Sequence, residues 1–203
     1  MNSITLSECL SVGENAFKNS AIQTVSLPKI TSIKANGFNN CRSLQSLNAP
    51  NIVEVGQTAI TDTLLTTLNF ANVTKCSSQS FYANKSVTSI NFPKITDVGS
   101  TAFGQCTALE IADFGSLASV ANSILSGCTA LNTLILRKNS MVSLSRASEL
   151  SSTQFGTNGN GGTLYVPESL VNTYKGNAKW AEAMAYNENN QILAIEGSPY
   201  ENV

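Results

Sequence analysis

The 203-residue chain contains no histidine, and charged residues make up only 12% of it, against roughly 25% in an average soluble protein. Without histidine, the chain lacks the commonest general base and the commonest metal ligand. Its net charge is −1, so the composition gives no basic surface for binding nucleic acid. Ser, Thr and Asn supply the polarity instead, and a hydrophobic content of 42% argues against disorder.

Long apolar runs and cofactor motifs are missing as well. No run approaches the roughly 18 apolar residues that a membrane span needs, so membrane insertion is not expected. The segment from Met1 to Leu6 shows neither the basic nor the apolar part of a signal peptide. Neither GxxxxGK(S/T) nor GxGxxG occurs, and the five cysteines include no CxxC pair. Phosphate-binding loops, zinc sites, redox motifs and cofactors are therefore not predicted.

A repeat of 21 to 22 residues runs through most of the chain. It is plainest in IQTVSLPKITSIKANGF from Ile22, LQSLNAPNIVEVGQTAI from Leu44 and VTSINFPKITDVGSTAF from Val87, which share the frame LxxLxxPxIxxVGxxAF. The first column of the frame holds Ile22, Leu44, Leu65, Val87, Leu109 and Leu131. The aromatic column holds Phe17, Phe38, Ile60, Phe81, Phe103 and Leu125. This period lies within the roughly 20 to 29 residues of leucine-rich repeats and is too short for repeats of paired helices.

The frame predicts a right-handed parallel solenoid of coils that each begin with a strand. The proline ends the strand, because it has no N–H to donate and its φ is fixed. The VGxxAF stretch is expected to turn the chain back through a short helical turn. Stacked coils then bury a shared core that no single coil could form. The expected strands are 24–27, 46–49, 67–70, 89–92, 111–114 and 133–136.

The repeat explains the cysteines. Cys41, Cys106 and Cys128 each follow the aromatic column by three residues, whereas Cys9 and Cys76 replace Ile or Val in inward columns. Buried free cysteine behaves as a small hydrophobic residue, so we expect five reduced and shielded thiols. A disulfide and a catalytic thiol are the alternatives, and the second is weakened because no histidine could activate it.

With its cysteine the frame becomes LxxLxxPxIxxVGxxAFxxC, and the stretch nearest to it is KITDVGSTAFGQCTAL, from Lys94 to Leu109. Over roughly residues 4 to 136 this pattern resembles the BspA-like leucine-rich repeats of bacterial surface proteins. TLILRKNSMVSL from Thr133 and GTLYVPESLVNTYKGNAKWAEAM resemble the closing part of such arrays in gut bacteria and their prophages. There it often ends surface or tail-associated proteins. Typical arrays are longer, so secretion and anchoring do not follow from the resemblance.

The period is lost near residue 136. We therefore divide the chain into a leucine-rich-repeat solenoid of about six coils at 1–136 and a C-terminal part at 137–203. Residues 137–162 are rich in Ser, Asn and Gly, and this composition predicts a loop.

The remaining C-terminal residues are expected to form a small α/β cap and a polar tail. A strand at 163–166 is stopped by Pro167, which suits the start of a helix, and a last strand is expected at 192–195. The cap would cover the apolar cross-section of the last coil. A ligand site around Tyr174 and Trp180 is the alternative interpretation.

The strands also predict a polar outward face. Its first ladder consists of Ser26, Asn48, Asn69, Asn91 and Asp113, and its second consists of Ser46, Thr67 and Ser89. The same two columns extend to Thr5, Ile135, Thr24, Ile111 and Thr133. Such a face can hydrogen-bond a peptide or a glycan, although a solvated sheet needs polar residues in any case. Aromatic rings, which sugar binding usually needs, are not expected there, because Phe70, Phe92 and Phe114 alternate inward.

Carboxylates are the only candidates for catalysis, and Glu110 with Asp113 is the one pair on the predicted face. A glycosidase holds two acids about 5 to 10 Å apart across a cleft. These two lie in one strand on an open surface. We therefore predict that the chain is not an enzyme and has no catalytic or metal site.

Two functions remain. The first is a recognition or adhesion module that binds a protein or glycan through the repeat face, at a cell surface or after secretion. The alternative is a structural or receptor-binding component of a phage or prophage tail. The first coil adds an expectation, because Ile4, Cys9 and Val12 belong to inward columns with no coil before them. Exposed apolar surface is unfavourable in water, so we expect this end to meet an upstream domain or a second copy.

Overall fold

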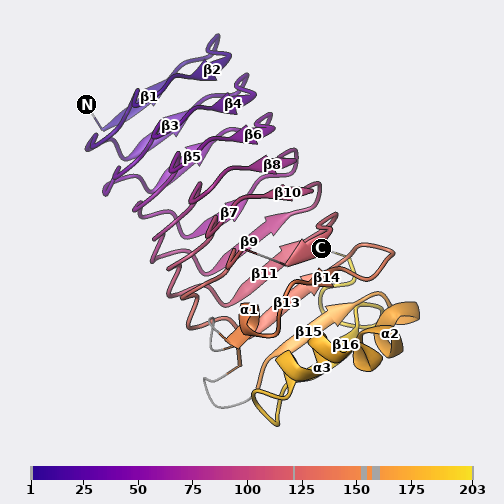
Figure 1. Cartoon of the computed structure of the whole chain (residues 1–203). Coiled ribbons are helices and arrows are strands. Elements are labelled where there is room, and N and C mark those ends of the chain that lie inside the picture. Colours follow the sequence, from indigo (N-terminus) through magenta and orange to yellow (C-terminus); the bar gives the residue numbers. More distant parts are fainter. Residues whose placement is uncertain (1, 121, 152–154, 157–160, 203) are drawn as a thin grey trace.

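The structure, a computed structural model, is a stack of parallel coils that ends in a small helical layer (Figure 1). It describes residues 2–120, 122–151, 155–156 and 161–202. The strands pair in parallel between equivalent columns of the repeat, so that Ile90 lies between Leu68 and Ala112. The parallel solenoid predicted from the repeat is confirmed.

The strands of the first face lie where the sequence predicts them. The predicted strands are β3 (Thr24–Ser26), β5 (Ser46–Asn48), β7 (Thr67–Asn69), β9 (Ser89–Phe92), β11 (Ile111–Phe114) and β13 (Thr133–Leu136). β9, β11 and β13 span the predicted residues, and the other three end one residue earlier. β1 (Ser3–Thr5) joins β3 and β5 in a three-stranded sheet, and β7 begins a six-stranded one.

A second short strand in the coils forms another face. A five-stranded sheet contains β2 (Ser11–Val12), β4 (Ser32–Ile33), β6 (Glu54–Val55), β8 (Lys75–Cys76) and β10 (Asp97–Val98). β12 (Ser119–Val120) pairs with β14 (Ser143–Leu144). At two residues each, these strands are too short for alternation to reveal them in the sequence.

The segments that link the second strand to the next coil form successive hydrogen-bonded turns, where short helical turns were expected. They carry pairs of residues with left-handed φ four positions apart, such as Asn36 (φ 57°) and Asn40 (φ 60°). The N–H groups of these two residues and of Phe38 donate to carbonyls of the next coil at 2.7 to 3.0 Å. A helix would use the same N–H groups within one coil. The turns thus add a third line of hydrogen bonds along the solenoid.

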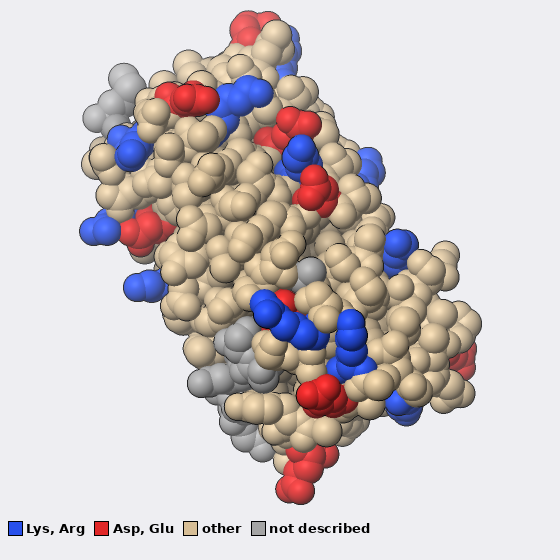
Figure 2. All heavy atoms as spheres, viewed as in Figure 1, with Lys and Arg blue, Asp and Glu red and all other residues tan. Residues whose placement is uncertain are grey.

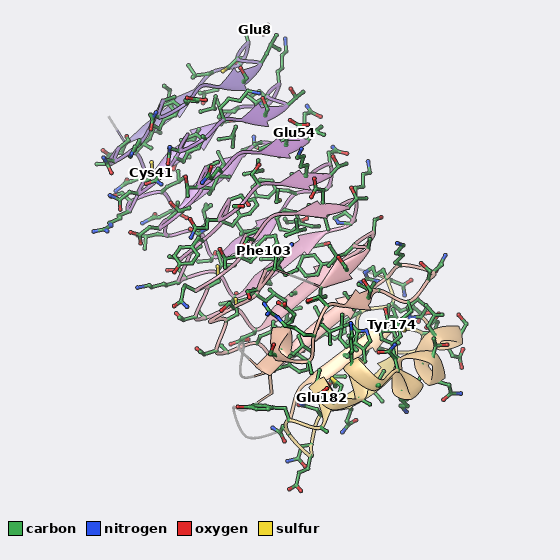
Figure 3. All side chains as sticks on the ribbon, viewed as in Figure 1. Glu8, Cys41, Glu54, Phe103, Tyr174 and Glu182 are labelled. Carbon is green, nitrogen blue, oxygen red and sulfur yellow. The ribbon has the colours of Figure 1, made fainter. Side chains whose placement is uncertain are left out.

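The aromatic column stacks along the axis inside the coils. The rings of Phe81 and Phe103 are 5.4 Å apart and nearly parallel, at 4°. Phe103 and Cys41 both lie within the stack in Figure 3, whereas Glu8 and Glu54 lie at its outer edge. The column therefore forms the continuous part of the core.

The three cysteines that recur after the aromatic column, Cys41, Cys106 and Cys128, form hydrogen bonds inside the core. Each donates its thiol hydrogen to the carbonyl of the aromatic column one coil earlier, at 2.9 Å for Cys41, 3.4 Å for Cys106 and 3.1 Å for Cys128. Asn84 occupies the same column, and its Nδ2 donates to the equivalent carbonyl at 2.8 Å. The position therefore takes a small buried donor. The expectation that all five thiols are shielded is wrong for Cys9, which is only half-buried.

The first face is interrupted between β5 and β7. In the described part of the chain these two strands belong to separate sheets. The interruption coincides with a shorter connection, since Leu65 follows Thr63 by two residues whereas Leu44 follows Cys41 by three. The N–H of Leu64 bonds to the carbonyl of Leu44 at 2.9 Å, and the Leu64 side chain is 42% exposed. The polar face consequently has two parts.

Residues 137–162 differ from the predicted loop. They contain β14 and the short helix α1 (Ser148–Ser151), so part of a further coil is present. The repeat spacing does not predict β14, because this strand begins 24 residues after β12 instead of the usual 21 or 22. The predicted loop at 152–154 and 157–160 lies outside the described residues.

The C-terminal strands extend the six-stranded sheet. β15 (Thr163–Val166) pairs with β13, and β16 (Gln191–Ala194) pairs with β15. Between them, a 3₁₀ turn leads into α2 (Val171–Gly176) and α3 (Ala178–Met184), where one helix was expected. The helix breaks at Asn177, whose side chain caps α3 by accepting two backbone N–H bonds. Among the described helices, none has the length and apolar character needed to span a membrane.

Tyr174, which is labelled in Figure 3, and Trp180 attach this helical layer to the coil below. The N–H of Val142 donates to Tyr174 Oη at 2.7 Å, and Trp180 Nε1 donates to the Val142 carbonyl at 2.9 Å. Both side chains have 0% exposure. The alternative of a ligand site around them is therefore wrong, because neither ring can be reached from solvent.

Glu149 closes the line of turn hydrogen bonds at the C-terminal end. Its Oε2 accepts the N–H of Ser123 at 2.6 Å, and its Oε1 accepts from Ser145 Oγ and Arg146 Nε at 2.9 and 3.0 Å. Ser123 is the left-handed residue one coil beyond Thr101, whose N–H bonds to a carbonyl of the next coil. A buried carboxylate therefore replaces the carbonyl that a further turn would supply.

The first coil is less covered. Ile4, Leu6 and Phe17 are only partly buried, and Leu10 is 67% exposed. Val12 is buried, because β2 pairs with β4. The contact of this end with an upstream domain or a second copy stays a prediction.

A pair of substitutions on β9 tests which side chains face the core. Phe92 is fully buried, so Phe92→Ala should lower the free energy of unfolding by about 3 to 5 kcal/mol. Asn91→Ala changes the outward neighbour and should stay within about 0.5 kcal/mol. Chemical denaturation measures both, and equal losses would mean that the strand faces are reversed.

Thiol titration tests the cysteine column. We expect Cys9 to react first in the native protein and the four buried thiols to react slowly, because a thiolate is the reactive form and burial raises the pKa of Cys76. Cys9→Ser should abolish the fast phase. Denatured protein without reductant should titrate five thiols, and a smaller number would reveal a disulfide.

Candidate functional site

The predicted polar ladders lie side by side on the first face. β7 and β9 place Thr67 opposite Ser89 and Asn69 opposite Asn91. The other part of the face pairs Ser26 on β3 with Asn48 on β5, and Ser46 stands in the second ladder. Alternation along each strand produces this arrangement, because successive side chains point to opposite sides of a sheet. The interruption between β5 and β7 separates the two parts.

Most of these side chains are open to solvent and have free hydrogen-bonding groups. Ser46, Asn48, Thr67 and Asn69 are exposed, whereas Ser26, Ser89 and Asn91 are half-buried. Asn48 Nδ2 donates to Ser26 Oγ at 3.1 Å. Among the described residues, the side chains of the other five members make no hydrogen bond. The face therefore offers donors and acceptors that the protein itself does not use.

Asp113 departs from the predicted open ladder. Although it points outward on β11, it is only 3% exposed and forms a two-point ion pair with Arg137, at 2.9 Å to Nε and 2.6 Å to Nη2. Burial raises the pKa of the Asp113 carboxyl, and the hydrogen bond and charge of Arg137 oppose this rise. The carboxylate is thus already partnered and cannot serve as a free ligand group.

The C-terminal tail, residues 195–202, lies beside Asp113. Arg137 Nη2 also donates to the carbonyl of Tyr200 at 2.9 Å, and the Tyr200 ring meets the Tyr165 ring edge-on at 5.1 Å. Tyr165 points outward on β15 in register with Ile135. The ladder positions hold no aromatic residue and Phe70, Phe92 and Phe114 are buried, as expected, but β15 and the tail add two rings beside the ladders.

A cavity of about 380 Å³ lies between the tail and the sheet. Its outward-facing strand residues are Thr67, Asn69, Ser89, Asn91, Ile111, Asp113 and Ile135, and the tail contributes Pro199 and Tyr200. Five of the predicted site residues line this cavity, namely Thr67, Asn69, Ser89, Asn91 and Asp113. The other three, Ser26, Ser46 and Asn48, do not. Sequence reasoning missed Arg137, Tyr165 and Tyr200. The alternation in β15 could have revealed Tyr165, but nothing in the sequence brings residue 200 back over the sheet.

A larger hollow on another side of the coils is less suited to a ligand. It measures about 550 Å³ and includes Lys29, Asn72 and Lys94. Both ammonium groups are engaged, because Lys29 pairs with Glu8 at 2.7 Å and Lys94 Nζ donates to Asn72 Oδ1 at 2.8 Å. Figure 2 shows that charged side chains are scattered over the visible surface without a large patch of one sign.

The described residues contain no arrangement that suggests catalysis. No group of three His, Cys, Asp or Glu among them could hold a metal ion. Glu110 is exposed, and Asp113, its predicted companion, is locked to Arg137.

Removing one partner of the Asp113–Arg137 pair tests the role of the tail. Arg137→Met leaves a buried carboxylate unpaired and should lower the free energy of unfolding by about 3 kcal/mol. It should also release the tail, so that chymotrypsin cleaves after Tyr200 faster than in the wild type. Adding Asp113→Leu removes the unpaired charge and should restore most of the stability. Denaturation and timed proteolysis measure the two effects, and unchanged cleavage in Arg137→Met would show that the pair does not hold the tail.

Comparison with known proteins agrees with this architecture. The sequence model of the BspA-type leucine-rich repeat region matches residues 10–132 in six copies, which is more than half of the chain. No curated protein matches.

Two solved structures are similar to this chain, and the first of them shares its fold. A leucine-rich repeat protein from Bacteroides ovatus ATCC 8483 is 16% identical and has a TM-score of 0.53, with 96% of this chain and 66% of that chain covered. A leucine-rich cell surface protein from Faecalibacterium prausnitzii A2-165 is 15% identical, with a TM-score of 0.45, and 98% and 61% of the two chains are covered. This chain thus spans less than two thirds of the length of either protein. From the six matched repeats, the chain belongs to the family of BspA-type leucine-rich repeat proteins.

Proposed function

We propose that this chain is a non-enzymatic recognition or adhesion module that binds a protein or glycan ligand through the polar face of its repeats. The observation that carries the proposal is the set of unpaired polar side chains in register on that face, at Ser46, Thr67, Asn69, Ser89 and Asn91. The repeat fold supports it, because leucine-rich-repeat solenoids are typically protein-interaction modules and not catalysts.

The chemistry of the face favours recognition at short range. The free groups of the two ladders are hydroxyls and amides, and the carboxylate of Asp113, the charged member of the ladders, is neutralised by Arg137. Uncharged groups give little electrostatic steering, so binding should depend weakly on ionic strength. Parallel strands hold the side chains in place before a ligand arrives, which lowers the entropy lost on binding.

The family suggests the setting. BspA-type repeats point to a bacterial cell surface or a secreted protein, and the face would then contact host or neighbouring cells. On a phage or prophage tail the same face would contact a receptor. The binding surface proposed here is the same in both settings.

A binding screen with matched variants tests the proposal. Immobilised protein is exposed to a glycan array, to purified surface proteins and to intact cells. Ser46→Arg with Asn69→Arg places a bulky charged group on each part of the face and should reduce binding at least about tenfold. Thr31→Arg is the control, because Thr31 is also exposed but directly precedes β4 of the second face.

Two results would contradict the proposal. One is that the wild type binds nothing in the whole screen. The other is that the double variant and Thr31→Arg bind as tightly as the wild type, since the ligand would then contact another surface. Binding that persists from about 0.05 to 0.5 M salt is the further expected result for an uncharged face.

A further inference from the structure

The C-terminal tail lies on the polar face in the way that a bound peptide would. Its Tyr200 ring contacts the Tyr165 ring, and its backbone carbonyl accepts a bond from Arg137. Ile135 points outward beside Asp113 and is nevertheless only 1% exposed. The face therefore already holds one peptide segment, through a backbone carbonyl and an aromatic side chain.

The cavity of about 380 Å³ lies at the edge of the tail, over the strands from β7 to β13. The tail leaves Thr67 and Asn69 on β7 exposed, and Asn91 on β9 half-exposed. On the side of the tail the lining is apolar, with Pro199, Tyr200, Ile111 and Ile135. On the side of β7 and β9 the outward side chains are polar, namely Thr67, Asn69, Ser89 and Asn91, and the inward-facing Leu68 and Ile90 also border the cavity. One half of the cavity thus suits hydrocarbon and the other half suits hydrogen-bonding groups.

These two halves match the chemistry of a protein segment. A side-chain amide offers both a donor and an acceptor, which is what a peptide group needs. The aliphatic side chains of Ile111 and Ile135 would leave sugar hydroxyls without partners, and burying such groups is unfavourable. An ionic ligand would also lack a partner, because the Asp113 carboxylate is taken by Arg137.

We propose that this cavity anchors an aromatic or large aliphatic side chain of a protein partner, while Asn69 and Asn91 bond to the peptide groups beside it. The inference rests on the proposed function and specifies its partner class and point of contact. The partner presents an uncharged segment with one exposed large apolar residue. Tyr200 supplies the ring against which that residue packs.

Methyl NMR with defined probes tests the proposal. Protein labelled at its isoleucine methyl groups is titrated with acetyl-Gly-X-Gly-amide, where X is Phe, Leu or Ala, and separately with methyl glucoside. The Phe and Leu peptides should shift the Ile111 and Ile135 signals in a saturable way. The Phe peptide should bind about tenfold more tightly than the Ala peptide, because Ala has far less apolar surface to bury.

A matched pair of variants locates the effect. Thr67→Lys puts a long charged side chain at the cavity and should lower the affinity for the Phe peptide at least about tenfold. Thr24→Lys is the control, because Thr24 stands in the same column, is equally exposed and lies outside the cavity. Thr24→Lys should bind as the wild type does. Unchanged isoleucine spectra in both variants without peptide would show that the fold is intact.

The outcomes separate this inference from the proposed function. Shifts with methyl glucoside and none with the peptides would replace the protein partner by a carbohydrate, and no shift with any probe would overturn the anchor site. If Thr67→Lys keeps the ligand found in the binding screen while Ser46→Arg alone, which lies outside the cavity, loses it, the cavity is wrong and the function stands. A wild type that binds nothing in that screen overturns both.

Discussion

Backbone hydrogen bonds between successive coils are the interaction on which the rest of this structure depends. They run along the first face, the second face and the turns, where the left-handed residues Asn36 and Asn40 direct their N–H groups at the next coil. Only with the coils at hydrogen-bonding distance do the aromatic column and the first apolar column close into one core. Cysteine and Asn84 side chains then satisfy carbonyls inside that core.

The same stacking produces the functional surface. A parallel sheet fixes equivalent side chains in rows, so a polar residue repeated once per coil becomes a row of Asn, Ser and Thr groups. The rows alone are a flat surface. The C-terminal tail gives them depth, because Arg137 holds the Tyr200 carbonyl and brings a ring over the end of the sheet. Repeats and tail together form the cavity that we propose as the anchor for a partner.

How much the sequence revealed depends on how local each feature is. The period was sufficient to locate β9, β11 and β13, because strand position in a solenoid follows from the repeat itself. β14 escaped notice since a longer connection broke the spacing before it. The ladder from Thr67 to Asn91 could be predicted from alternation, but the burial of the Asp113 side chain could not. Its burial depends on Arg137, 24 residues away, and on Tyr200, which contacts the sheet only through tertiary structure.

The most direct test of the central claim, that the tail completes the site on the polar face, is the nuclear Overhauser spectrum of the Tyr200 ring. The structure predicts cross-peaks from its ring protons to the Tyr165 ring, whose centroid is 5.1 Å away, and to the Ile135 methyl groups that line the same cavity. Sharp Tyr200 signals at random-coil positions, without cross-peaks to either residue, would show that the tail does not lie on the sheet and would contradict the account.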